Sequence, residues 1–212
     1  MKNLALIILV LAAVSLGCGK LSGLLPGGRG GSASGGSDPK ADIVEASRKF
    51  IALQAFSAKM NGMGQTEIKS QVDYIAPDRF HIMYLGGTGA GMEMIMIGNQ
   101  SFMKTNGKWS KMDGDNNASV PTLRDSFTEE GLKTLTDVKF EGEETVDGKT
   151  ALAYTYKNVT PKGAYPFSAK IWVGKASGLP MKIVVDYSNG TLKQMTVNYD
   201  TESPVTIEAP AI

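Results

Sequence analysis

The sequence predicts an α+β fold in which a strongly curved antiparallel sheet of about ten strands forms an unclosed half-barrel, with helices covering its concave face. Three observations lead to this expectation. Apolar residues recur at helical spacing in two segments, and they alternate with polar residues in several others. Short turns rich in Gly, Asn, Asp and Pro separate the alternating segments, which is typical of hairpins between antiparallel strands.

The first seventeen residues have the order of a bacterial signal peptide. Lys2 gives a positive start, and an apolar run over 4–16 is followed directly by Gly17-Cys18. The run is shorter than the roughly 20 residues that a membrane-spanning helix needs. The stretch 14–18 (Val-Ser-Leu-Gly-Cys) resembles the lipobox of bacterial lipoproteins, so we expect cleavage before Cys18 and lipid on its thiol. The alternative is an ordinary secretory signal that happens to contain a cysteine.

Residues 18–39 follow as a flexible tether with the lipidated cysteine at its start. The segment consists largely of Gly and Ser and offers little from which to build a core. A Gly-rich coil of this length has a reach of about 25 Å. We therefore expect three parts: a signal peptide (1–17), a lipid-bearing tether (18–39) and one folded domain (40–212).

The folded domain is expected to open with a helix that runs from Asp38-Pro39 to Asn61-Gly62. Pro in the first turn and an acid at the positive helix end favour a start here, and Asn-Gly favours a stop. One face of this helix is apolar and consists of Ile43, Ala46, Phe50, Leu53 and Met60. Such a face must pack against another apolar surface.

The expected strands follow this helix in two groups of equal size. The first group covers residues 65–75, 79–85, 91–98, 100–105 and 108–112, and the second covers residues 137–146, 149–158, 166–174, 179–188 and 191–200. A second helix is expected between the groups, over residues 120–135. Pro121 suits its first turn, and an apolar stripe is formed by Leu123, Phe127, Leu132 and Leu135.

Charge and composition exclude several classes of function. The chain has 22 basic and 21 acidic residues, and removal of the signal peptide with Lys2 leaves the two in balance. Nucleic acid is therefore not an expected partner, because phosphate binding requires a basic excess. A single cysteine also excludes internal disulfides and cysteine-based metal clusters, and no cofactor is expected.

The space between sheet and helices is the expected ligand site. Met92, Met94 and Met96 alternate along one strand, and such a flexible, polarisable wall adapts to ligands of varied shape. The same pattern also fits an ordinary core strand. The other candidates for the cavity wall are apolar residues on the helices and on further strands: Phe50, Leu53, Phe80, Ile82, Tyr84, Phe127, Ile171, Ile183 and Val185. We expect some of them to be core residues rather than ligand contacts.

The order of several short motifs resembles the lipoprotein-sorting superfamily that includes LolA, LolB and the mycobacterial lipid-binding lipoproteins LppX and LprG. The motifs are Ala-Pro-Asp-Arg-Phe-His-Ile (76–82), Ile-Gly-Asn-Gln-Ser-Phe-Met-Lys (97–104), Gly-Lys-Trp (107–109), Ile-Trp-Val (171–173), Ser-Gly-Leu-Pro-Met (177–181) and Tyr199 before Ile-Glu-Ala-Pro (207–210). The likeness covers most of residues 40–212. It implies an unclosed β-barrel with a helical lid that binds the acyl chains of lipids or lipoproteins without catalysis.

The sequence contains no convincing catalytic or metal-binding set. His81, the only histidine, lies inside an expected strand without cysteines or clustered carboxylates, so we interpret it as structural. Ser101 and Lys104 have the Ser-x-x-Lys spacing of penicillin-recognising enzymes, but those enzymes carry the motif on a helix and here it lies on a strand. We expect neither an enzyme nor a metal site.

These features together predict a lipoprotein of the cell envelope that acts as a carrier or chaperone. Its expected ligands are the acyl chains of lipids or lipoproteins, and its membrane contact is the lipid on Cys18. Gly19 follows the cysteine in place of Asp, which favours the outer membrane, facing the periplasm. The alternative is an envelope sensor or scaffold that uses the same fold to bind a protein partner.

Overall fold

The computed structural model describes residues 37–87, 89–112, 127–159 and 166–212. The expected signal peptide, Cys18 and nearly all of the expected tether lie outside these residues. No helix in the described ranges is long and apolar enough to cross a membrane.

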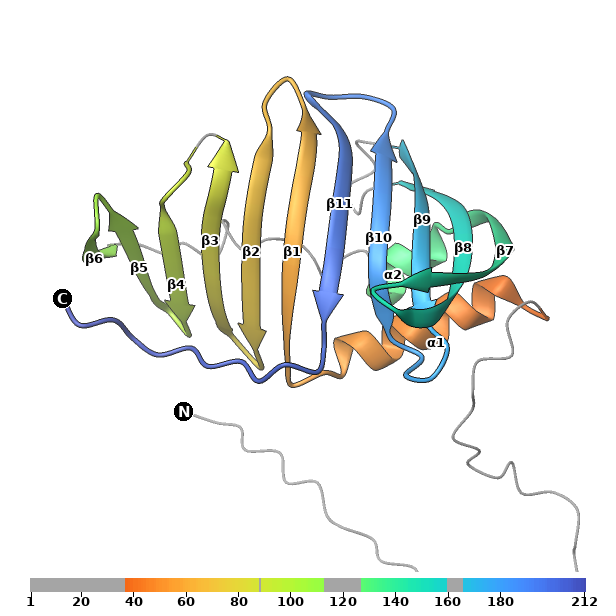
Figure 1. Ribbon diagram of the computed structural model, residues 1–212, viewed down its shortest axis with the longest axis horizontal. Helices are drawn as coiled ribbons and strands as arrows, with labels where there is room; N and C mark the ends of the chain where they lie inside the picture. The colour runs from red at the N-terminus through yellow and green to blue at the C-terminus, as the bar shows by residue number, and fades with distance from the viewer. Residues whose placement is uncertain (1–36, 88, 113–126, 160–165) are drawn as a thin grey trace, which may run out of the picture. The chain divides into compact units, whose positions relative to one another are not determined.

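One antiparallel sheet of 11 strands contains all strands of the described chain, in the order β6-β5-β4-β3-β2-β1-β11-β10-β9-β8-β7 (Figure 1). The strands are β1 (Ala55–Gly64), β2 (Ile68–Ile75), β3 (Arg79–Gly87), β4 (Glu93–Ile97), β5 (Gln100–Thr105), β6 (Lys108–Met112), β7 (Thr136–Val146), β8 (Lys149–Val159), β9 (Pro166–Gly174), β10 (Pro180–Tyr187) and β11 (Leu192–Asp200). The edge strands β6 and β7 do not pair with each other, so the sheet is open. The expected curved and unclosed sheet is therefore confirmed.

Along the sequence, strands β1 to β6 run from the middle of the sheet to one edge, and strands β7 to β11 run from the other edge back to the middle. Strands β1 to β6 follow one another as antiparallel neighbours, and β7 to β11 do the same from the opposite edge. The two halves meet where β11 pairs with β1, from Ser57 opposite Asp200 to Gly64 opposite Leu192. A single long-range strand pair, between β1 and β11, therefore joins the two halves of the sheet.

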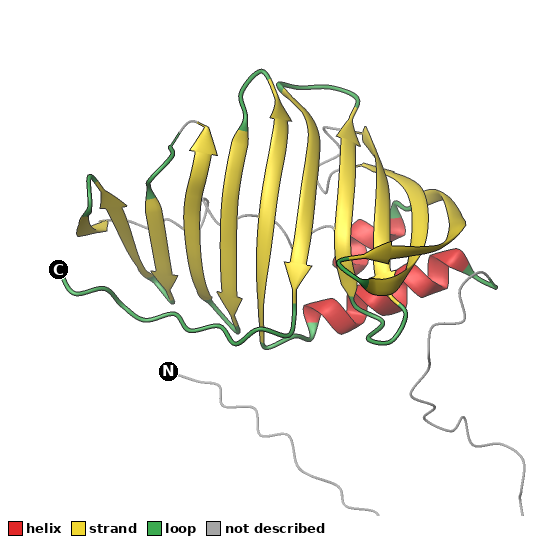
Figure 2. Ribbon diagram, viewed as in Figure 1, coloured by secondary structure: helices red, strands yellow, loops and turns green. Residues whose placement is uncertain are grey.

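The two described helices lie at one end of the sheet. Helix α1 (Pro39–Ile51) packs against β7 and β10, and the short α2 (Glu129–Lys133) lies near it behind the same end (Figure 2). No described helix lies over β2 to β6 (Figure 1). The expected helical cover of the concave face is therefore not confirmed, because the described helices pack at one end of the sheet only.

The first helix is shorter than expected, because residues 55–64 form a strand. Asp38 caps the helix by accepting a hydrogen bond from the Ala41 backbone at 3.0 Å, but the helix ends at Ile51 rather than at Asn61-Gly62. Met60 fits the helical spacing of the apolar face, yet it also alternates with Ala58 as a strand requires. Pairing with both β2 and β11 satisfies the backbone of this segment, which decides the ambiguity in favour of a strand.

The expected second helix is represented by α2 alone, and residues 120–126 lie outside the described chain. Thr128 caps α2 by accepting a hydrogen bond from the Gly131 backbone at 3.3 Å. Gly131 does not break the helix. Its buried carbonyl accepts a hydrogen bond from the Asn158 side chain of β8 at 3.1 Å, which anchors α2 to the sheet.

The main core lies between the helices and one face of the sheet, which we call the inner face. Side chains of α1, α2 and Phe127 pack there against alternate residues of β1, β2 and β8 to β11. On the opposite, outer face, the segment after β11 runs past the ends of the first strands (Figure 1). Ile207 in this C-terminal segment is only 3% exposed and packs with Ile95 and Phe102, while Arg79 donates a hydrogen bond to its carbonyl at 3.2 Å.

Candidate functional site

The inner face carries all but one of the predicted cavity residues, in two apolar clusters. The first cluster lies beneath the helices and contains Phe50, Leu53, Phe80, Phe127, Ile171, Ile183 and Val185. The second lies on β1 to β4 and contains Met60, Val72, Phe80, Ile82, Tyr84, Met94 and Met96. Both clusters contain Phe80 and Met60, so the apolar surface is continuous between them.

A row of aromatic rings links the two clusters across the strands. The Phe50 ring of α1 lies 4.9 Å from that of Phe127 and 4.7 Å from that of Phe56 on β1. The row continues from Phe56 to Tyr74 at 5.2 Å and from Tyr74 to Phe80 on β3 at 5.1 Å. These contacts arise because every second residue of neighbouring strands points to the same side of a sheet.

Of the three methionines predicted to form one wall of the cavity, two lie on β4 and Met92 lies just before that strand. Met94 and Met96 lie on β4 opposite Ile82 and Phe80, which places both on the inner face. Met92 precedes β4 and lies outside both inner clusters, although its carbonyl accepts a hydrogen bond from the Tyr84 backbone at 3.0 Å. Within the second cluster Ile82 and Met96 are buried, whereas Phe80, Tyr84 and Met94 are only half-buried.

Three tyrosines of the first cluster were not among the predicted site residues. Tyr156 on β8 and Tyr187 on β10 both pack against Phe167, with ring centroids 6.4 Å and 6.1 Å from that of Phe167. Tyr199 on β11 packs against Phe50 at 4.9 Å. Alternation along the strands did indicate that each tyrosine points to the inner face. It does not distinguish a tyrosine whose hydroxyl has a hydrogen-bond partner from one whose hydroxyl has none.

The outer face holds a polar groove of about 850 Å³. Outer residues of β1, β2 and β11 line it, together with the β7–β8 turn and the C-terminal segment. Lys149, the first residue of β8, pairs with Glu202 of the C-terminal segment at 2.7 Å. None of the predicted cavity residues lines this groove or a smaller groove over β7 to β10.

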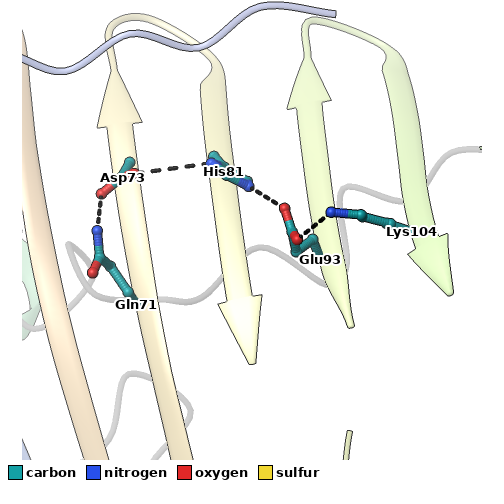
Figure 3. A network of polar contacts seen from close by, with 5 residues as sticks. All are labelled: Gln71, Asp73, His81, Glu93 and Lys104. Atoms are coloured by element: carbon teal, nitrogen blue, oxygen red, sulfur yellow. Dashed lines mark hydrogen bonds and ion pairs between the residues drawn. The ribbon is translucent and has the colours of Figure 1, made fainter. Parts of the chain in front are cut away.

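A row of polar side chains crosses the outer face from β2 to β5, as Figure 3 shows. Asp73 accepts a hydrogen bond from Gln71 at 3.0 Å and lies 3.9 Å from His81 Nδ1. His81 Nε2 lies 3.2 Å from Glu93 Oε2, and Lys104 Nζ donates a hydrogen bond to Glu93 Oε1 at 2.7 Å. The cross-strand register aligns these residues, because Asp73 is opposite His81 and Glu93 is opposite Lys104.

This row gives His81 two carboxylate neighbours that the sequence alone did not reveal. The hydrogen bond from Lys104 lowers the pKa of Glu93 below its usual 4.5, His81 contributes in the same direction, and partial burial opposes both. No group of three or more His, Cys, Asp or Glu residues in the described ranges has the arrangement of a metal site. The row therefore resembles a structural ladder between strands.

Comparison with known proteins finds likeness in structure but not in sequence. No family model and no curated protein matches the chain. Lipoprotein LppX from Mycobacterium tuberculosis superimposes with a TM-score of 0.61 and 16% identity, over 80% of this chain and 98% of LppX. LprF from Mycobacterium bovis superimposes with a TM-score of 0.62 and 12% identity, over 82% of this chain and 97% of LprF.

The chain has the fold of LppX and LprF. The resemblance predicted from short motifs is thereby confirmed at the level of the fold. A LolA superfamily protein from Nitrosomonas europaea also matches, at a TM-score of 0.32 and 8% identity, over 80% of this chain and 96% of that protein. Identities this low establish the fold and leave the ligand to be argued from the residues of this chain.

Proposed function

We propose that this chain is a lipoprotein of the cell envelope that binds the acyl chains of lipids or lipoproteins against its inner face, as a carrier or chaperone. Lipid on Cys18 would anchor it to a membrane, with the outer membrane favoured by Gly19. Two observations support the proposal: the signal-peptide pattern before Cys18, and a fold shared with a mycobacterial lipoprotein.

The second inner cluster carries the proposal. Phe80, Tyr84 and Met94 form a contiguous apolar surface that is half-buried, and no described helix lies over it. Sheet faces of soluble proteins are normally covered when they are this apolar. Methionine on such a surface suits ligands of varied shape, because its side chain is flexible and polarisable.

The energetics of an acyl chain fit a carrier rather than a permanent store. Burial of one methylene contributes roughly 0.8 kcal/mol, so a chain of about 16 carbons gains on the order of 10 kcal/mol before the costs of binding are subtracted. A membrane offers the same chain a comparable environment. The net preference for the protein is therefore small, and exchange between the two is easy.

The substitution Met94→Asp tests this placement of the ligand. A carboxylate on the inner face would have to be buried against the acyl chain, which is strongly unfavourable without a partner. We expect delipidated Met94→Asp to lose binding of a fluorescent diacyl phospholipid, measured by titration. Met63→Asp is the matched control, because Met63 is 56% exposed, and it should bind as the wild type does.

Circular dichroism would establish that both variants are folded. Folded wild type that binds no probe would contradict the carrier function, and equal binding by folded Met94→Asp would contradict the placement of the ligand. Mass spectrometry of lipids extracted from the purified protein would identify what it carries in the cell.

The outer groove favours a second candidate function, the envelope sensor or scaffold. Most of the residues that line it are polar or charged, and its volume of about 850 Å³ is large enough for a short segment of another protein. A protein that carries no extractable lipid and binds no acyl probe, yet needs Lys59 or Lys149 of this groove for its activity in the envelope, would support this alternative.

A further inference from the structure

Four methionines surround Ser101 on the inner face of β4, β5 and β6. Met96 on β4 and Met112 on β6 lie directly opposite Ser101, one on each side. Met103 is the next inner residue of β5, and Met94 lies opposite it on β4. These four side chains, which we call the methionine ring, therefore come from three adjacent strands and share one face of the sheet.

The strand register keeps the side chains of the methionine ring within reach of one point. Residues directly opposite each other in an antiparallel pair have Cβ atoms about 4.5–5.5 Å apart, and diagonal neighbours are about 7–8 Å apart. A methionine sulfur lies two bonds beyond Cβ, on an unbranched side chain with three rotatable bonds. Because Ser101 is much smaller than its neighbours, the sulfurs of Met96, Met103 and Met112 can turn toward the space above it.

Ser101 itself gives an independent indication of a ligand at this place. Its side chain is only 6% exposed, and its hydroxyl has no hydrogen-bond partner among the described residues. Polar groups this deeply buried are normally paired. In the described part of the chain no fully enclosed side-chain nitrogen or oxygen atom lacks a partner, so the Ser101 hydroxyl keeps some accessible area that a bound species can reach.

The chemistry of the methionine ring favours a soft, monovalent metal ion. Thioethers are soft ligands that select Cu(I), whereas Mg²⁺ and Ca²⁺ prefer carboxylate, carbonyl and water oxygens. The carboxylates of the neighbouring strands, Asp73 and Glu93, belong to the row on the outer face (Figure 3). Met94, Met103 and Met112 are half-buried, and a single charge is cheaper to remove from water at such a place than a double one.

We propose that the methionine ring is a binding site for Cu(I), with Met96, Met103 and Met112 as ligands, Met94 as a fourth, and the Ser101 hydroxyl beside the ion. The inference goes beyond the acyl-binding function and does not depend on it. No metal site was expected from the cysteine, histidine and carboxylates of the sequence. Thioethers from three strands become neighbours only through the strand register.

Anaerobic titration of purified, delipidated protein with Cu(I), against a chromophoric Cu(I) chelator, measures this site. The comparison is with the fourfold variant Met94→Leu, Met96→Leu, Met103→Leu and Met112→Leu. Wild type should bind one more ion per chain than this variant, and X-ray absorption should show sulfur at about 2.3 Å, the usual length of a metal–sulfur bond in proteins. Leucine is close to methionine in volume, so the variant should stay folded, which circular dichroism would establish.

Met83→Leu is the matched control for the loss of a methionine. Met83 lies on β3 opposite Gln71 and Glu93, which places it on the outer face, so the variant should bind Cu(I) as the wild type does. The single variants Met103→Leu and Met112→Leu should each weaken Cu(I) binding at least about tenfold, because even the loss of a group that only orients a metal ligand costs that much. These two keep the test decisive if the fourfold variant does not fold.

The same variants separate the Cu(I) site from the proposed carrier function. Leucine preserves the apolar area of the inner face, so the folded fourfold variant should still bind the fluorescent phospholipid. Wild type that binds no more Cu(I) than the fourfold or single variants would overturn the Cu(I) site and leave acyl binding intact. A bound ion surrounded by nitrogen or oxygen alone would overturn it as well.

Discussion

Phe50→Ala is the most informative test of how α1 is attached to the sheet. The Phe50 side chain is 0% exposed, although it projects from a helix at the margin of the domain. Its ring centroid lies 4.7 Å from that of Phe56, 4.9 Å from that of Phe127 and 4.9 Å from that of Tyr199. Truncation would remove the only ring that joins the helix to all three neighbours among the described aromatic contacts.

The expected loss of stability follows from these contacts. Phe→Ala substitutions in closely packed cores lower the free energy of unfolding by about 3–5 kcal/mol. A domain of ordinary stability, about 5–15 kcal/mol, would lose a large fraction of it. With a urea dependence of about 2 kcal/mol per molar, the unfolding midpoint should fall by about 2 M.

Urea unfolding of a chain that begins after Cys18, followed by circular dichroism, measures this change. Leu85→Ala is the control, because Leu85 is 59% exposed and should change the stability by less than about 0.5 kcal/mol. Phe50 was predicted as a cavity residue, and a residue beside an empty space has fewer contacts to lose. A loss below about 1 kcal/mol would refute the close packing inferred here and would favour the cavity instead.

Three further predictions concern the outer face and the anchor. Ile207→Ala should lower the free energy of unfolding by about 2–4 kcal/mol in urea, because this side chain is 3% exposed and packs the C-terminal segment onto the sheet; an unchanged midpoint would show that the segment is not held there. Lys104→Met should destabilise the protein by about 0.5–1 kcal/mol at pH 7, since its contact with Glu93 is partly exposed. The folded pKa of Glu93 is lowered, so this pair stabilises above pH 4.5 and the difference between variant and wild type should shrink as the pH falls below that value; a pH-independent difference would contradict the pairing. Cys18→Ser should accumulate as an unlipidated precursor in mass spectra, and mature protein with an unmodified Cys18 would rule out the lipid anchor.

The strands were largely predictable because alternation is a local property. Nine of the expected segments from 79–85 onwards coincide with β3 to β11 within about two residues, since turns such as Asn106-Gly107 and Asp147-Gly148 mark their ends. The exception is the segment after α1, where the same apolar residues fit two periods. Only pairing with β2 and β11 decided that 55–64 is a strand, and β11 lies more than a hundred residues away in sequence.

The candidate site was predictable in its general composition and less so in its organisation. Alternation identified the inner residues such as Ile82 and Met94. Alternation could not show that Met92 falls outside β4, because the end of a strand depends on hydrogen bonds to the neighbouring strand. It also could not show which tyrosine hydroxyls lack a partner, because the partner of Tyr154 is Asp42 in a helix far away in sequence.

The sequence by itself determined the class of fold and the surfaces it would build. Local periodicity, turn residues and the segment before Cys18 are all properties of short stretches of chain. Each can be recognised without knowing how the remainder of the chain folds. The tertiary structure decided the cross-strand partners, such as the row from Asp73 through His81 to Glu93, and the burial of Ile207 against the outer face of the sheet. These depend on register between strands and on contacts across the sheet, which arise only when distant segments pair.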